Sequence, residues 1–256
     1  MLLGNTITQN NPAVLHAGEG IPFTAGWYCD EDSDQSASVP RVPHTGGANL
    51  LDPVKVLGIN NTAYPSGGGF WISGATERLA AAYNTVPDIM PGTGSISVCF
   101  WHYPYSAQAS DAMLCGFNNR AGVFAAGGTG WQIRRDGSNW THKVLVATPG
   151  QGLFTQVCEA TPGHSAVHQY GFILNREAKT LACFSDGVID SSPLDITALS
   201  AGSLNPDAYG LSFGGGYTTG SALKGGFSDL LIYVGAWSAA NITALWNGGD
   251  GVYPMV

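Results

Sequence analysis

Short runs of alternating apolar and polar residues dominate the chain after residue 65. In the stretch SISVCFWH, Ile96, Val98, Phe100 and His102 share one face, and the residues between them share the other. Strict alternation with a period of two is typical of a β-strand. Comparable runs follow at DAMLCGF, GWQIRR, HKVLVA, YGFILN, TLACFS, YGLSFG and SDLLIYV. Many short strands separated by Gly, Asn, Asp and Pro predict an all-β fold, either a sandwich or a barrel.

Local signals predict one hairpin and one short C-terminal helix, and helical patterns are otherwise almost absent. Asp186-Gly187 lies between two apolar stretches in CFSDGVID, and these two residue types tolerate the positive φ of a tight hairpin turn. The stretch TERLAAAY is compatible with two turns of helix. Near the C-terminus, SAANITALW places apolar residues at helical spacing behind Ser238, a plausible N-cap. Gly248 and Gly249 then end this helix.

The chain divides by pattern at about residue 65. Residues 1–65 are rich in Asn, Pro, Gly and Asp and show little sustained periodicity. They predict either an N-terminal arm or extra strands with long connections, and the sequence leaves both readings open. A long structureless loop inside a compact domain is unusual, so an arm would have to be held by something outside the core. Residues 66–256 are predicted to form the sandwich.

Composition favours one large domain with a neutral surface. Of 256 residues only 11% are charged, whereas 36 are glycine and 11% are aromatic. The formal net charge is -8 with ten Lys and Arg in total, so a nucleic acid or an anionic membrane surface is not an expected partner. The opening MLLGNTITQN has no basic segment and is too short in apolar residues for a secretory signal, so export is not expected unless a mature form carries a new initiating Met.

The pattern of the five cysteines favours buried thiols over a metal or redox site. Their number is odd and no CxxC pair occurs, so neither zinc nor redox chemistry is indicated. Cys99 and Cys183 lie inside apolar strand patterns, where a thiol behaves as a small hydrophobe. A disulfide or a reactive thiol is the alternative. No metal and no cofactor are expected.

The order of these segments resembles the concanavalin A-like lectin/glucanase superfamily and, within it, the laminin G-like domains. The matching pieces are SISVCFWHYP, a central pair near AMLCGF and GWQIRRDG, HQYGFILN, the hairpin LACFSDGVID and the closing unit FSDLLIYVGAWSAANITALWNGG. Trp237 stands where the family tends to have Leu. The resemblance covers roughly residues 65 to 250. It implies a jelly-roll antiparallel β-sandwich whose closing strand returns to the sheet of the early strands, with Leu245 and Trp246 packed on the sandwich edge.

The sequence offers little for catalysis. Glucanases of this superfamily carry an E-x-D-x-x-E strand, because a retaining glycosidase needs two carboxylates about 5 Å apart, and no glutamate here has that spacing. No G-x-S-x-G elbow is present. Asp30, Asp32 and Asp34 match the start of a calcium loop, but Gln35 and Arg41 occupy positions that require Gly and Glu. The pair of His164 and His168 lacks the helical context of a zinc motif.

One stretch carries weak candidates for ligand binding. In GWQIRRDGSNW, Trp131 and Trp140 flank Asp136 and Asn139, and an exposed aromatic beside polar groups suits a sugar face. The competing and favoured interpretation places both tryptophans in the core or at the edge of two strands joined by the Asp136-Gly137 turn.

Two functions fit these observations. The first is a non-enzymatic virion structural protein of a bacteriophage, a capsid decoration or tail component, located in a virion assembled in the host cytoplasm. The resemblance to laminin G-like domains of phage structural proteins, which often end on something like LWNGGDG, favours it. Its partners would be other virion proteins or copies of itself, contacted through the N-terminal segment. The alternative is a carbohydrate-binding module or lectin of a cell-surface or extracellular protein, with glycans as partners.

Overall fold

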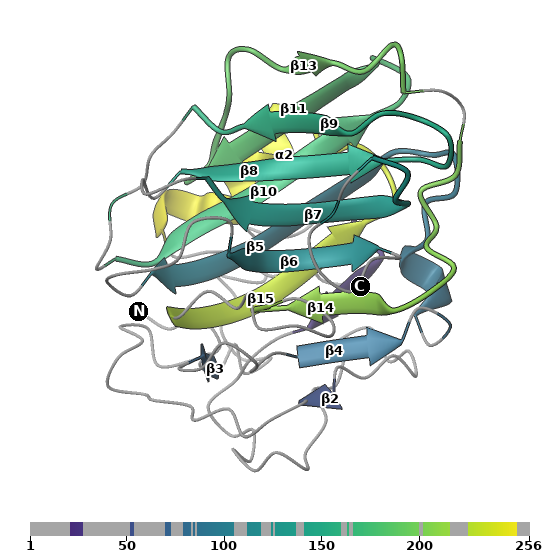
Figure 1. Ribbon diagram of the computed structural model, residues 1–256. Helices are drawn as coiled ribbons and strands as arrows, with labels where there is room; N and C mark the ends of the chain where they lie inside the picture. Colours follow the sequence, from purple (N-terminus) through teal and green to yellow (C-terminus); the bar gives the residue numbers. More distant parts are fainter. Residues whose placement is uncertain are drawn as a thin grey trace.

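The fold is an antiparallel β-sandwich closed by one short helix, seen in a computed structural model of the chain (Figure 1). This confirms the all-β fold class expected from the sequence. The structure describes residues 21–27, 52–53, 70–72, 79–82, 84, 86–104, 112–118, 124, 126–136, 141–159, 163, 166–199, 202–215 and 225–249.

Two sheets face each other within the described residues. The eight-stranded sheet contains β1 (Ala25–Trp27), β3 (Phe70–Ile72), β5 (Ile96–Pro104), β10 (His168–Asn175), β11 (Thr180–Ser185), β12 (Val188–Ile189), β13 (Leu194–Asp195) and β15 (Gly225–Tyr233). The seven-stranded sheet contains β2 (Asp52–Pro53), β4 (Leu79–Ala82), β6 (Met113–Asn118), β7 (Gly130–Arg135), β8 (His142–Ala147), β9 (Phe154–Val157) and β14 (Gly210–Phe213). Short 3-10 turns lie at Pro87–Ile89 and Asn247–Gly249.

The closing strand β15 occupies an interior position of its sheet, in the order β1-β15-β5-β10-β11-β12. It pairs with β5 from Gly225 opposite Pro104 to Tyr233 opposite Ser97, with a register shift between Ser228 and Leu231. The strand therefore returns to the sheet of the early strands, as the family resemblance implies.

The main core fills the space between the sheets. It consists of the apolar side chains that alternate inward from both sheets, among them Ile96, Val98 and Phe100 of β5 with Trp131 of β7 and Phe172 of β10. All five are completely buried. The alternation read from the sequence thus marks the face that points into the sandwich.

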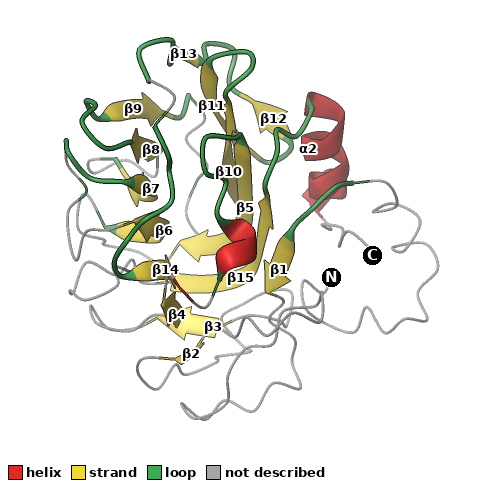
Figure 2. Cartoon of the chain, turned by 90° about the vertical axis from the view of Figure 1, so that its right-hand side faces the viewer, coloured by secondary structure: helices red, strands yellow, loops and turns green. Residues whose placement is uncertain are grey.

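A second core covers the outer face of the eight-stranded sheet. Figure 2 shows the helix α2 (Ala239–Trp246) on the side of this sheet that faces away from the other sheet. Ile242 and Leu245 of α2 pack there with Cys99 and Trp101 of β5. Both faces of β5 are therefore buried. This explains why the face that points away from the other sheet carries Cys99 and Trp101 among its residues.

The N-terminal residues 21–27 join this second core. Ile21 belongs to the same cluster, and β1 pairs with β15. The indole Nε1 of Trp237 donates to the Pro22 carbonyl oxygen at 2.6 Å, and the Val234 backbone N–H donates to Thr24 Oγ1 at 2.8 Å. Two pieces of the segment 1–65 thus add edge strands, β1 and β2. The boundary between residues 65 and 66 stays a prediction, because the surrounding residues lie outside those described.

Residues 79–82 correct one expectation. By sequence the stretch TERLAAAY is compatible with two turns of helix, but its described part is the strand β4, paired with β14 and β2. Pairing on both sides supplies more hydrogen bonds than two turns of helix could, so tertiary context overrides the local propensity. None of the helices among the described residues combines the length and hydrophobicity that crossing a bilayer requires.

The helix α2 begins at a reciprocal cap, which confirms Ser238 as its N-cap. Ser238 Oγ accepts the backbone N–H of Asn241 at 3.2 Å, and Asn241 Oδ1 accepts the backbone N–H of Ser238 at 2.9 Å. At the other end, Asn247 adopts the left-handed conformation with φ 46°.

Removing this cap should have a moderate cost. We expect Ser238→Ala to lower the free energy of unfolding by about 1 kcal/mol, because the backbone N–H of Asn241 loses its acceptor and Asn241 Oδ1 loses the Ser238 hydroxyl donor. For a domain of this size the melting temperature should fall by about 2–4 °C, measured by circular dichroism. Ser238→Thr is the matched control, since threonine is also a good N-cap and should retain most of the stability. Equal losses in both variants would contradict the capping role.

Candidate functional site

The candidate residues of the stretch 131–140 do not form an exposed aromatic site within the described residues. Trp131 is 0% exposed, and its ring meets Phe172 edge-on at a centroid distance of 5.3 Å. Its indole therefore belongs to the core, the position that the competing interpretation gave it. Asp136 is partly exposed and forms an ion pair with Lys143, with 3.1 Å between Asp136 Oδ1 and Lys143 Nζ. Asn139 and Trp140 lie outside the described residues.

Other sequence candidates are placed only in part. Four candidates lie outside the described residues: Asp30, Asp32, Asp34 and His164. The expectation that they bind no metal therefore stays a prediction. His168 is described, as the first residue of β10. Four of the five cysteines are described, and all four are buried free thiols: Cys99, Cys115, Cys158 and Cys183.

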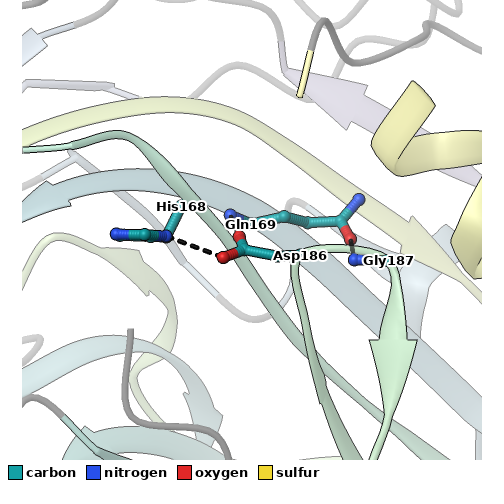
Figure 3. Close-up of polar contacts among 4 residues, drawn as sticks. All are labelled: His168, Gln169, Asp186 and Gly187. Atoms are coloured by element: carbon teal, nitrogen blue, oxygen red, sulfur yellow. Dashed lines mark hydrogen bonds and ion pairs between the residues drawn. The ribbon is translucent and has the colours of Figure 1, made fainter. Parts of the chain in front are cut away.

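His168 opens a polar network at one end of the sandwich (Figure 3). Its Nδ1 lies 2.8 Å from Asp186 Oδ2, and Asp186 Oδ1 accepts the backbone N–H of Gln169 at 2.9 Å. The side-chain oxygen of Gln169 in turn accepts the backbone N–H of Gly187 at 3.0 Å. Four residues from β10 and the β11–β12 turn are thereby linked in one chain of contacts.

The local sequence explains why Asp186 and Gly187 sit here. Both have positive φ, 48° and 81°, which is the signature of a two-residue type I′ hairpin turn. The turn joins Ser185 to Val188, which face each other in the register. A Cβ on Gly187 would lie 2.8 Å from Cβ of Trp246, so glycine also allows the half-buried indole of α2 to pack on the turn. The hairpin predicted at Asp186-Gly187 is confirmed.

The network has capacity left for a ligand. The Asp186 side chain is 31% exposed and that of His168 is 15% exposed, so both are reachable from solvent. Among the described residues, His168 Nε2 and Gln169 Nε2 are buried atoms with no hydrogen-bond partner. In Figure 3 the Nε2 atom of His168 points away from Asp186. A carboxylate, an imidazole and an amide together can accept and donate several hydrogen bonds.

Inward from this network lies a cluster of histidine rings around Tyr170. The ring of Tyr170 is 4.7 Å from His142, 6.0 Å from His102 and 6.2 Å from His168, measured between centroids. Tyr170 and His142 come from opposite sheets, so the cluster spans the interior at this end. The end of the β7–β8 hairpin that carries Asp136 belongs to the same end of the sandwich, because Arg135 pairs with His142.

Burial controls the protonation of this cluster. It lowers the pKa of His142 to about 3, and a backbone contact with Gly171 opposes this effect only in part, so the ring is neutral at pH 7. Burial, assisted by the charges of Asp186 and Cys158, raises the pKa of the Tyr170 hydroxyl. The neutral His142 ring lies next to Cys158 and Cys183, and these three side chains are the ones among the described residues that could together hold a metal ion.

Sequence reasoning identified the Asp186 turn but not its role. Asp186 meets His168 only because β10 and β11 pair with Tyr170 opposite Ser185, and this register cannot be read from either strand alone. The available signal was weak: His168 opens one predicted strand, and Asp186 ends another.

Solved structures similar to this chain are lectin-like sandwiches. The CBM40 module of the Ruminococcus gnavus IT-sialidase bound to α2,3-sialyllactose matches with a TM-score of 0.52 and 16% identity over 69% of this chain and 95% of the module. The receptor-binding domain of the botulinum neurotoxin C/D mosaic serotype matches with a TM-score of 0.64 and 11% identity over 89% of this chain and 51% of that domain. The botulinum neurotoxin serotype D ligand-binding domain in complex with N-acetylneuraminic acid matches with a TM-score of 0.62 and 10% identity over 93% of this chain and 52% of that domain.

These similarities show the fold. The chain spans about half the length of the two toxin domains. No protein-family model matches the sequence, and no curated protein matches it. The antiparallel β-sandwich expected from the sequence is therefore confirmed. Nothing in these matches supports the laminin G-like assignment or the bacteriophage origin, which stay predictions.

Proposed function

We propose that this chain is a non-catalytic glycan-binding module, and that it binds sugar at the network of His168, Gln169 and Asp186. Support comes from the partly exposed His168–Asp186 pair at one end of a sandwich that is similar to solved structures of other proteins in complex with sialyllactose or N-acetylneuraminic acid. This was the alternative function drawn from the sequence. The virion role and virion location remain predictions, testable by following the chain through density-gradient fractionation of particles.

Some contacts of the network hold the hairpin turn, whereas the side chains of His168 and Asp186 are available to a ligand. The Gly187 backbone N–H donates to the Gln169 side-chain oxygen, and the Gly187 carbonyl oxygen accepts from Thr243 Oγ1 at 3.2 Å, so both contacts hold the hairpin turn. The contact between His168 and Asp186 joins two side chains and lies outside the backbone of the turn, and it holds an imidazole and a carboxylate that are both partly exposed. A carboxylate that keeps free lone pairs accepts sugar hydroxyl groups well.

Charge indicates which glycans fit best. The chain carries a net charge of -8, and the carboxylate of Asp186 stands at the centre of the network. A sialic acid carboxylate would meet this negative potential. Neutral oligosaccharides avoid that repulsion while offering hydroxyl donors to Asp186. Trp246, packed against Gly187 one residue away, supplies an aromatic surface beside the carboxylate.

Glycan titration with matched variants tests this function. We expect lactose and other neutral oligosaccharides to bind in isothermal titration calorimetry, and sialyllactose to bind more weakly. Asp186→Asn keeps the shape and tolerates the positive φ of the turn, but it removes the charge, so binding should weaken about tenfold, or about 1.4 kcal/mol. Asp195→Asn is the control, because Asp195 is an exposed carboxylate that accepts from Thr197 at the opposite end of β11.

The outcomes separate the function from its location. Failure of the wild-type chain to bind any glycan of a broad array would contradict the glycan-binding function. Binding that survives Asp186→Asn as well as it survives Asp195→Asn would leave the function standing and move the site elsewhere on the sandwich.

A further inference from the structure

Three side chains with soft donor atoms meet in the interior, away from the proposed glycan site. His142 opens β8, Cys158 follows β9 directly, and Cys183 lies in β11. The His142 nitrogen and the two Sγ atoms all lie within 4.8 Å of one another, and all three residues are buried. His142 and Cys158 come from the seven-stranded sheet and Cys183 comes from the other, so the three residues bridge the two sheets.

The charge distribution around this cluster suits a cation. The Nε2 atom of His142 lies 2.8 Å from the Cys158 sulfur. The Asp190 backbone N–H donates to the Cys183 carbonyl oxygen at 3.0 Å, and Asp190 Oδ2 accepts the backbone N–H of Glu159 at 3.0 Å. Asp190 therefore contacts the backbone at Cys183 and next to Cys158. A bound cation would favour the thiolate form of its cysteine ligands and would itself be stabilised by a nearby carboxylate.

The spacing is close to that of a metal centre. Zinc lies about 2.3 Å from a thiolate sulfur and about 2.0–2.1 Å from an imidazole nitrogen, which places tetrahedral ligand atoms about 3.5–3.8 Å apart. Side chains within 4.8 Å of one another reach this spacing by small rotations. The pair of His142 Nε2 and Cys158 Sγ would have to separate by about 0.7 Å, which a rotation of the Cys158 side chain can supply.

We propose that His142, Cys158 and Cys183 form a buried site for a thiophilic d10 cation, zinc(II) or copper(I), that cross-links the two sheets. Two thiolates and an imidazole are donors that these ions prefer, whereas magnesium and calcium prefer oxygen. Three ligands complete a trigonal copper(I) site. Zinc takes a fourth donor, and Asp190 is the carboxylate beside Cys158, where its Oδ2 accepts the backbone N–H of Glu159 at 3.0 Å.

Binding releases the protons of both thiols, since only the thiolate is a metal ligand. The ion exchanges those protons for two metal–sulfur bonds and one metal–nitrogen bond, with no change of oxidation state. The buried position leaves no role for a substrate, so the site is structural. It tightens the contact between β8, β9 and β11 that packing alone otherwise maintains.

Metal titration of the full chain tests the proposal. The protein is stripped of metal under a thiol-free reductant and titrated separately with zinc sulfate and with copper(I) held by a competing chelator. We expect one ion per chain by elemental analysis, a dissociation constant of micromolar or tighter for one of the two ions, and a higher melting temperature in its presence. Cobalt(II) should give sulfur-to-metal charge-transfer absorption in the wild-type protein, a readout that needs no variant.

Cysteine variants assign the ligands. Cys158→Ser and Cys183→Ser should weaken binding at least a hundredfold and remove the cobalt absorption. Cys115→Ser is the matched control, because Cys115 is also a completely buried thiol of the main core, and it should leave binding unchanged. Absence of binding by the reduced wild-type chain would overturn the proposal, as would equal binding by Cys183→Ser. A disulfide between Cys158 and Cys183 in peptide maps, with no metal bound after reduction, would replace the metal site by a redox cross-link.

Discussion

Replacing Trp131 with alanine should lower the free energy of unfolding by about 3–5 kcal/mol. The indole is completely buried between the sheets, against Phe172. Its removal leaves a cavity that the strands β7 and β10 cannot close, since their positions are fixed by ladders on both sides. Urea unfolding followed by far-ultraviolet circular dichroism measures the change.

An exposed apolar residue serves as the control for this prediction. Val188 is 67% exposed in the hairpin strand β12, and Val188→Ala should change the unfolding free energy by no more than about 0.5 kcal/mol. If Trp131→Ala instead kept full stability and lost glycan binding, the tryptophan would be a sugar platform, and its place in the core would be wrong.

The second large effect is expected at Gly171, in the middle of β10. This strand lies between β5 and β11, and a Cβ at residue 171 would collide with the Val98 carbonyl oxygen and with the ring of Phe184. The ring can turn, but the carbonyl belongs to the β5 backbone and cannot move without breaking the ladder. Gly171→Ala should therefore cost about 3 kcal/mol or more, or prevent folding.

Gly152→Ala is the matched glycine control. No heavy atom lies within 4 Å of a Cβ built at Gly152. Alanine there should be neutral, or should stabilise the fold by up to about 1 kcal/mol because it lowers the conformational entropy of the unfolded chain. Thermal unfolding compares the two variants directly. A Gly171→Ala protein as stable as Gly152→Ala would show that β10 does not approach the Val98 carbonyl oxygen of β5 as closely as described.

Much of the fold follows from local sequence. The alternation from Ile96 onward, the Asp186-Gly187 turn and the Ser238 cap each act through the backbone of their own segment, so a pattern of a few residues is enough to predict them. The strand at 79–82 could not be predicted in this way. Its Leu and Ala favour a helix locally, and only pairing with β14 and β2 makes it extended.

The candidate sites depend on long-range register, which the sequence does not display. Asp186 reaches His168 through the pairing of β10 with β11. Cys158 and Cys183 meet His142 through the packing of one sheet on the other. The absence of a CxxC motif was a fair argument against a local zinc loop, but it says nothing about ligands that three separate strands bring together.

The interior position of β15 has a consequence for synthesis on the ribosome. β1 and β5 are made first, yet both pair with β15, which lies between them. At about 5–20 residues per second, β1 waits some ten seconds or more for its neighbour. While the residues between β5 and β15 are being made, the edge of β5 that later pairs with β15 has no partner strand. Co-translational folding can thus begin with the consecutive strands β6 to β9 and with the β10–β11 hairpin, but the sandwich closes only when β14 and β15 have emerged, which makes the nascent chain a natural client for chaperones.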